Sequence, residues 1–259
     1  MRIAICLSGG LRTFKIAAPL MMKSFVQPLK KRGHEIDFYF YGLSNIDGIE
    51  KNKEDIKQIY NPKKWLIKDW DLTAETEVLR TFSKSQLEFI NSKKRPESNI
   101  IANLSQMYNI KKVFELMEEY ECEHNFTYDL AIRSRVDYYY YRSLTDIQIS
   151  EAYKVNNILI PNTWDFKQVR QYAMSDSFAV GRSEEMKRYS KIYDYIHQLV
   201  VKTNLFHVES LTGYYISHNA TLNRIEISKD NHWFWFEYPP GSPTSSVIRT
   251  DYDIQRRNI

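Results

Sequence analysis

The opening of the chain alternates between a strand pattern and a helix pattern, and this alternation constrains the fold most. Residues Ile3 to Leu7 form a short, wholly apolar run, which indicates a buried strand. A helical pattern extends from about Thr13 to Lys31, and Ile36 to Tyr41 gives a second strand pattern. A strand, a helix and a strand in this order are typical of a parallel pair with a crossover helix. We therefore predict an α/β fold with a mixed, mostly parallel sheet flanked by helices.

Later segments continue the same alternation. Apolar spacing predicts further helices over Ala74–Phe89, Ile100–Tyr120, Arg182–Val201 and Val208–Ser217. Short apolar runs predict further strands over Lys64–Ile67, Tyr128–Ile132, Asn157–Ile160, Ser177–Val180 and Leu222–Ile227. We expect these elements to form a single domain over residues 1–259, with an aromatic tail over residues 230–259 that folds back onto it or contacts a partner.

Composition and charge narrow the class of function. The 259 residues are 43% hydrophobic and 26% charged, enough to bury a globular core. A formal net charge of +4 suits an anionic ligand or a membrane surface but is too small to indicate nucleic acid. Cys6 and Cys122 match neither a zinc site nor a disulfide framework, which favours a reducing compartment. Because no apolar run suits a signal peptide or a spanning helix, we expect a cytoplasmic protein with at most peripheral membrane contact.

The segment from Tyr128 to Asp137 ends an apolar strand pattern in alternating charges. Arg133, Arg135 and Asp137 occupy alternate positions, so in an extended chain their side chains point to one face. Ligands of open α/β sheets bind at the carboxyl ends of the strands. Two guanidinium groups and a carboxylate there suit a diphosphate and a bridging divalent cation. An exposed ladder of ion pairs on an edge strand explains the same pattern.

The segment Ser8-Gly9-Gly10 is expected to be the turn that leaves the first strand. Backbone amides at such a turn face an anion at the N-terminus of the next helix, and Arg12 adds a cation within reach of a phosphate. A tight turn without a ligand is the alternative. Ser-Gly-Gly after a first strand also resembles the pyrophosphate loop of ATP pyrophosphatases. Leu11-Arg12-Thr13, however, lacks the acidic residue with which that loop continues.

The long helix predicted from Ile100 carries a small polar patch. Asn103 and Gln106 lie one turn apart and interrupt an otherwise core-facing helix. Ordinary solvent exposure is the alternative to a binding role.

Three motifs together resemble a group of small GT-A-type glycosyltransferases of surface-polysaccharide clusters and large viruses. They are a strand with Ser-Gly-Gly-x-x-Arg, a helix with Gln-x-Tyr-x-x-Lys, and Tyr-Asp-x-x-Ile-Arg-x-Arg-x-Asp. The resemblance extends from Met1 to about Val180 and implies a GT-A-like, Rossmann-like sheet. It implies transfer of a sugar from a nucleoside-diphosphate sugar to a hydroxyl of a glycan or lipid-linked acceptor. The donor would be bound by Ser8, Gly9, Gly10, Arg12, Gln106, Arg133 and Arg135.

The resemblance also implies a divalent cation, Mn²⁺ or Mg²⁺, at the donor diphosphate. The segment from Ile132 to Asp137 occupies the place of the GT-A metal motif Asp-x-Asp. Arg135 stands where the first aspartate would be, which leaves Asp137 as the single carboxylate ligand. His232 is the candidate for a last ligand, because GT-A chains often supply one near the C-terminus.

Three acidic residues are candidates for the acceptor side. Asp165 follows Trp164, Asp176 begins a strand pattern similar to the family's Asp-x-Phe-x-x-Gly, and Glu209 begins a short helix. A carboxylate base at the acceptor hydroxyl would serve an inverting transfer, and we expect Asp176 in that role, with Glu209 second. Each also has a structural explanation, as a turn cap, a strand-end hydrogen-bonding group or a helix-dipole partner.

The sequence therefore predicts a nucleotide-sugar-dependent glycosyltransferase of glycan or surface-polysaccharide synthesis. Residues 1–140 would form the nucleotide-sugar-binding half and residues 141–229 the acceptor-side half. The competing hypotheses are an ATP-pyrophosphatase-type enzyme and a non-catalytic carbohydrate-binding protein with the same fold.

Overall fold

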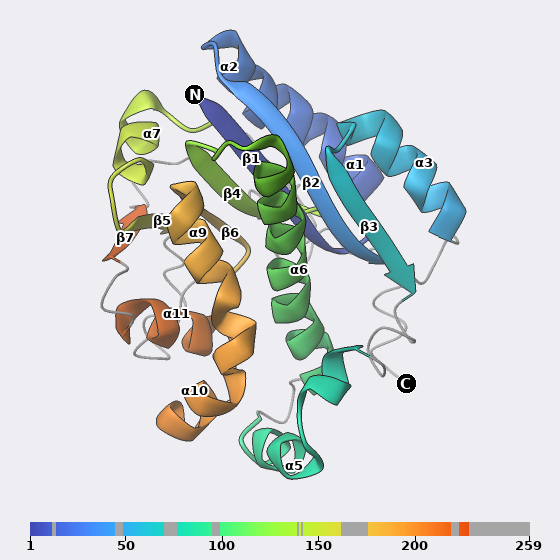
Figure 1. Ribbon diagram of the computed structural model, residues 1–259, viewed down its shortest axis with the longest axis vertical. Coiled ribbons are helices and arrows are strands. Elements are labelled where there is room, and N and C mark those ends of the chain that lie inside the picture. Colours follow the sequence, from blue (N-terminus) through green and yellow to red (C-terminus); the bar gives the residue numbers. More distant parts are fainter. Residues whose placement is uncertain are drawn as a thin grey trace, which may run out of the picture.

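A seven-stranded sheet forms the centre of the protein, with the strand order β3-β2-β1-β4-β6-β5-β7 (Figure 1). The computed structural model describes residues 1–11, 14–44, 49–69, 77–94, 99–138, 140, 142–161, 176–218 and 223–227. The strands are β1 (Arg2–Gly10), β2 (Glu35–Ser44), β3 (Lys64–Asp69), β4 (Leu130–Arg135), β5 (Asn157–Pro161), β6 (Phe178–Gly181) and β7 (Asn223–Ile227).

Most neighbouring strands of this sheet are parallel. β1 pairs in parallel with β2 and β4, β2 with β3, and β5 with β7. Of the strands that the structure describes, only β6 runs the other way, between β4 and β5. The expected α/β fold with a mixed, mostly parallel sheet is therefore confirmed.

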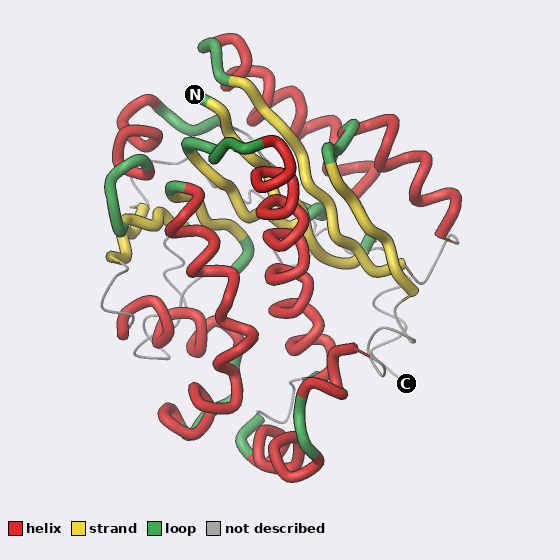
Figure 2. The backbone as a smooth tube through the Cα atoms, in the orientation of Figure 1, coloured by secondary structure: helices red, strands yellow, loops and turns green. Residues whose placement is uncertain are grey.

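Helices cover both faces of the sheet (Figure 2). One layer contains α1 (Phe14–Leu20), the π-helical turn Met21–Val26, α2 (Gln27–Lys31) and α3 (Ile49–Tyr60). The other side carries α5 (Lys84–Ser92), α6 (Ile100–His124), α9 (Ser183–Ser190), α10 (Ile196–Thr203) and α11 (Val208–His218). The short α7 (Asp146–Ala152) lies near β5.

The alternation of side chains along β1 explains the two layers. Ile3, Ile5 and Leu7 pack into one hydrophobic core with residues of α1 and the π-helical turn. Ala4 and Cys6 point to the opposite face and join the core under α6 and α9. The small side chains on that face let the long helix α6 approach the sheet. Cys6 is fully buried, and its Sγ lies 3.7 Å from Sδ of Met117 in α6.

Two sequence expectations about element ends were wrong. Ser8-Gly9-Gly10 is not a turn, because β1 stays paired with β2 as far as Gly10, which lies opposite Leu43. The strand expected over Tyr128–Ile132 lies instead at Leu130–Arg135, so both arginines belong to the strand itself.

Some predicted helices are interrupted, and others were missed. The helix expected over Arg182–Val201 is divided by a 3-10 segment over Lys191–Tyr195. The one expected over Ala74–Phe89 is interrupted at Ser83, whose side chain accepts from the backbone N–H of Gln86 and begins α5 as a capping box. The helices α3 and α7 were not predicted. In the described part of the chain, no helix is both long and apolar enough to cross a membrane.

Gly181 in β6 allows β5 to approach closely. A Cβ at this position would lie 2.8 Å from the backbone oxygen of Asn157 in β5, an atom that can move only with its strand. We expect Gly181→Ala to lower the free energy of unfolding by about 3 kcal/mol, the upper end of ordinary overpacking.

Chemical denaturation measures this loss. Gly33→Ala is the matched control, because a Cβ there meets open space and only the positive φ of 81° opposes it; its cost should be about 1 kcal/mol. Equal losses in the two variants would contradict the close approach of β5.

Candidate functional site

The candidate site lies where β4 ends and β6 begins. Because β6 is antiparallel, its first residue, Phe178, pairs with Ser134 near the carboxyl end of β4. The residues just before β6 therefore lie beside the residues that end β4. The backbone N–H of Arg135 donates to the carbonyl of Ser177 at 3.2 Å. This pairing places Asp176 at the carboxyl edge of the parallel strands.

Arg133 is buried under α6. Its neighbours in the sheet are Cys6 and Ala179, whose side chains lie in the core on the α6 side. The side chain is only 1% exposed, and its Nη1 donates to the carbonyl oxygen of Ser177. Its Nε has no hydrogen-bond partner among the residues that the structure describes. A buried guanidinium in this position supplies a fixed positive charge to the site.

Arg135 and Asp137 form a bidentate ion pair. Nε and Nη2 of Arg135 each donate to a carboxylate oxygen of Asp137 at 2.8 Å. Burial alone would lower the pKa of Arg135, but the Asp137 carboxylate raises it well above its usual range. Asp137 is almost fully buried, whereas Arg135 keeps 20% of its side chain exposed. Asp137 therefore orients a guanidinium that can still be reached from solvent.

Asp176 is a buried carboxylate among charged groups. Nε2 of Gln106 in α6 donates to its Oδ2. Burial and, after it, the charge of Glu209 raise the pKa of Asp176 to about 6, against the lowering effect of Arg133 and Arg135. Such a carboxylate is ionised at neutral pH and more basic than an exposed aspartate.

Glu209 stands in the first turn of α11 and is held by His207. Nδ1 of His207 accepts from the backbone N–H of Ser210 at 3.3 Å, so the ring proton lies on Nε2. Nε2 is 2.9 Å from Oε2 of Glu209 and donates to it. The carboxylate of Glu209 is therefore already hydrogen-bonded.

The end of β1 borders the same edge of the sheet. Ser8 lies opposite Arg135 in the parallel pairing, and its buried Oγ has no hydrogen-bond partner within the described part of the chain. Gly9 has a φ of 127°, a conformation that L side chains rarely adopt. The backbone of Gly9 also approaches Gly42 of β2, where a Cβ would lie 3.3 Å from the Gly9 oxygen.

The structure brings together most of the residues selected from the sequence. They are Ser8, Gly9, Gly10, Gln106, Arg133, Arg135, Asp137, Asp176 and Glu209. Arg12, Asp165 and His232 lie outside the described residues. Among the side chains that are described, no group of three or more His, Cys, Asp and Glu is placed to hold a metal ion.

Several polar residues in the described part of the chain were not predicted. His207 orients Glu209. Burial raises the pKa of Tyr189 to about 12, and the nearby charge of Arg133 opposes that rise. Ser105 and Asn109 lie one turn apart on the buried side of α6, and neither Ser105 Oγ nor Asn109 Oδ1 has a partner among the described residues. Each is a polar residue at a helical position that faces the core. Hydrophobic spacing locates the apolar positions of a helix but does not identify such buried polar residues.

Comparisons with known proteins give this chain a family but no activity. Residues 1–202 match a family described as Domain of unknown function (DUF7796). No curated protein matches the chain. Among solved structures, the apo form of mouse xyloside xylosyltransferase 1 is similar, with a TM-score of 0.45 and 11% sequence identity. The similarity covers 86% of this chain and 84% of that one.

The raised pKa of Asp176 predicts a pH-dependent stability. An aspartate in the unfolded chain has a pKa of about 3.9. Between pH 4 and 6, Asp176 is therefore protonated more fully in the folded protein than in the unfolded chain. Stability then falls as the pH rises through this window, by about 3 kcal/mol in all. We expect Asp176→Asn to be more stable than the wild type at pH 8 by up to about 3 kcal/mol, and within about 1 kcal/mol of it at pH 4.

Denaturation curves at the two pH values test this expectation. Asp146→Asn is the control, because that carboxylate is 83% exposed and its removal should not produce such a profile. If Asp176→Asn destabilised the protein equally at both pH values, Asp176 would be a structural residue.

Proposed function

We propose a function from the site itself, because the chain belongs to a family whose description, Domain of unknown function (DUF7796), gives no activity. The proposed function is that of a nucleotide-sugar-dependent glycosyltransferase. It transfers a sugar from a nucleoside-diphosphate sugar to a hydroxyl of a glycan or lipid-linked acceptor. The GT-A resemblance of the sequence motifs supports the same reaction class.

One observation carries the proposal. Two arginines and a carboxylate of raised pKa meet at the carboxyl edge of a mostly parallel sheet, where α/β folds bind their ligands. A reaction with a diphosphate leaving group needs positive charge on one side and a base on the other. This edge offers both within one buried cluster.

The guanidinium groups would stabilise the leaving diphosphate. Arg135 is held by Asp137 and is partly exposed, so it can donate to a phosphate oxygen. Arg133 is fixed by the Ser177 carbonyl and adds positive charge from beneath. As the bond between the anomeric carbon and the diphosphate breaks, negative charge grows on the phosphate oxygens. Preorganised cations there lower the barrier to that step.

Of the two acidic candidates that the structure describes, Asp176 is the better base. Each carboxylate already accepts a hydrogen bond, Asp176 from Gln106 and Glu209 from His207. The pKa of about 6 leaves Asp176 ionised near neutral pH and still basic, which favours it as the base. In an inverting transfer, the acceptor oxygen would attack the anomeric carbon and give its proton to Asp176. The negative charge of Glu209 would help to keep the pKa of Asp176 raised.

A metal at Asp137 does not fit the described arrangement. Both of its oxygens accept from Arg135, so a cation would first have to displace the guanidinium. In this arrangement the phosphate charge is neutralised by Arg133 and Arg135. Dependence on Mn²⁺ or Mg²⁺ and the role of His232 stay predictions from the sequence.

The base assignment predicts the pH profile of transfer. With saturating donor, the rate should fall below about pH 6 as Asp176 takes up a proton. Asp176→Asn should lower the transfer rate by about 10²-fold or more, while nucleoside-diphosphate affinity stays within about 1 kcal/mol of the wild type. Rates from pH 5 to 8 and calorimetry with the nucleoside diphosphate measure the two effects. An active Asp176→Asn enzyme would move the base to another residue.

The donor side predicts a coupled loss in two variants. Arg135→Gln should weaken binding of UDP or GDP by about 1.5–3 kcal/mol. Asp137→Asn should also weaken the binding of UDP or GDP, because Arg135 loses the carboxylate that orients it. Arg2→Gln removes the same charge at the opposite edge of the sheet and should leave the affinity unchanged.

A thermal-shift panel with ATP and with UDP- and GDP-sugars separates the competing functions. Preferential stabilisation by ATP over UDP- and GDP-sugars would favour the ATP-pyrophosphatase hypothesis. Binding without any release of nucleoside diphosphate would favour a non-catalytic carbohydrate-binding protein.

A further inference from the structure

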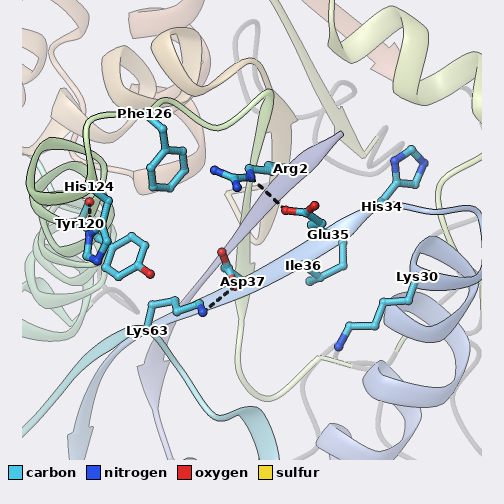
Figure 3. Close-up of a pocket in the computed structure, with 10 residues that line it drawn as sticks. All are labelled: Arg2, Lys30, His34, Glu35, Ile36, Asp37, Lys63, Tyr120, His124 and Phe126. Atoms are coloured by element: carbon cyan, nitrogen blue, oxygen red, sulfur yellow. Dashed lines mark hydrogen bonds and ion pairs between the residues drawn. The ribbon is translucent and has the colours of Figure 1, made fainter.

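A cavity lies at the opposite side of the sheet from the candidate site, near the amino ends of β1 and β2 (Figure 3). Its volume is about 720 Å³, and it is lined by the first residues of β1 and β2, the end of α2, and the last turn of α6 with the loop after it. β1 has nine residues, so at about 3.3 Å per residue the two edges are roughly 25 Å apart. This cavity, the amino-edge bay, is therefore separate from the candidate site.

The lining of the bay has more unsatisfied positive than negative charge. Its two carboxylates are already engaged, since Glu35 accepts from Nε of Arg2 at 2.9 Å and Asp37 accepts from the hydroxyl of Tyr128 at 2.7 Å. Asp37 also forms an ion pair with Lys63, whose Nζ lies 3.5 Å from Oδ1 of Asp37. Lys30 also lines the bay and is exposed, and it makes no ion pair with the described residues. The bay can therefore accept one negative charge.

Arg2 presents the end of its guanidinium to the bay. Cζ of Arg2 lies 5.0 Å from the centroid of the Phe126 ring. Figure 3 shows the terminal nitrogens of Arg2 pointing toward the space between Phe126 and Tyr120. No hydrogen bond joins these two nitrogens to residues in the described part of the chain. Two adjacent N–H donors in a rigid plane match a carboxylate.

Aromatic rings form another wall. The rings of Tyr120 and His124 are stacked with centroids 3.9 Å apart, and the Tyr120 hydroxyl points into the bay (Figure 3). Nδ1 of His124 lies 2.9 Å from the Tyr120 carbonyl and donates to it, so Nε2 is an acceptor. The wall therefore combines flat apolar surface with hydrogen-bonding groups.

The end of α6 does not oppose an anion strongly. Carbonyls of its last turn carry the negative end of the helix dipole, but they are capped. The Tyr120 carbonyl accepts from His124, and the carbonyls of Glu121 and Cys122 accept from the backbone N–H groups of Phe126 and Asn125.

We propose that the amino-edge bay binds a saccharide that carries one carboxylate, of the uronic acid class. The carboxylate would accept from the terminal nitrogens of Arg2, near Lys30 and Lys63. Sugar hydroxyls would donate to Asp37, Glu35 and Nε2 of His124, and the sugar ring would pack against the aromatic wall. A phosphate brings nearly two negative charges against the two carboxylates, which favours the singly charged ligand. The proposal does not depend on the proposed transferase activity.

A titration of the ¹⁵N-labelled full chain with D-glucuronate tests the proposal by NMR. We expect saturable shifts of the amide signals of residues 2, 35–37 and 120–126, which line the bay or adjoin its lining. D-glucose, the neutral match, should bind about tenfold more weakly, because it lacks the charge-assisted hydrogen bonds. Arg2→Gln and Lys30→Gln should each raise the Kd about tenfold.

Two controls isolate the contact. Lys31→Gln removes the same charge from the neighbouring exposed position of α2, which does not line the bay, and should leave the Kd unchanged. Arg135→Gln should also leave it unchanged, which separates the bay from the candidate site. Lys30 is exposed and makes no ion pair with the described residues, so its variant reports on binding even if Arg2→Gln weakens the start of β1.

Three results would overturn the proposal. The first is an unchanged Kd in both Lys30→Gln and Arg2→Gln. The second is equal binding of glucose and glucuronate, and the third is tighter binding of glucose 6-phosphate than of glucuronate at the same signals.

Discussion

The antiparallel pairing of β6 with β4 is the constraint on which the candidate site depends. It places Ser177 against the end of β4, where the Ser177 carbonyl accepts from both the side chain of Arg133 and the backbone of Arg135. Asp176 is thereby held beside two guanidinium groups and under Gln106 of α6. A parallel strand in the same position would bring the other end of the segment to this edge. The reversed strand β6 thus brings together segments that are far apart in the chain.

Opposing electrostatic effects in the site determine the protonation state of Asp176. Burial and Glu209 favour a protonated Asp176, whereas Arg133 and Arg135 favour its ionised form. These opposing effects leave the carboxylate poised near neutral pH, at a cost to the stability of the folded protein. His207 keeps Glu209 hydrogen-bonded, so the two acidic side chains are not equivalent. In the proposed function, this difference in environment would allow Asp176 to act as the base.

Local pattern was sufficient for the fold class, and it selected several residues that the structure places close together. It did not reveal the contacts that these residues make. Apolar runs located β1 and β4, and alternation placed Arg133 and Arg135 on one face. That Arg135 pairs with Asp137 through both oxygens depends on how the chain bends after β4, which no periodicity encodes. The contact of Gln106 with Asp176 joins residues 70 positions apart. The amino-edge bay was not anticipated, because His124 and Phe126 follow a helix end as ordinary polar and aromatic residues do.

The two cysteines differ in a way that has a practical consequence. Burial raises the pKa of the Cys6 thiol well above its usual range, so almost none of it is the nucleophilic thiolate. Cys122 is exposed near the end of α6. Maleimide and iodoacetamide reagents should therefore attach to the native chain at one position, without any prior removal of cysteines. That position lies on the helix turn that borders the amino-edge bay, which makes it a natural attachment point for a fluorophore.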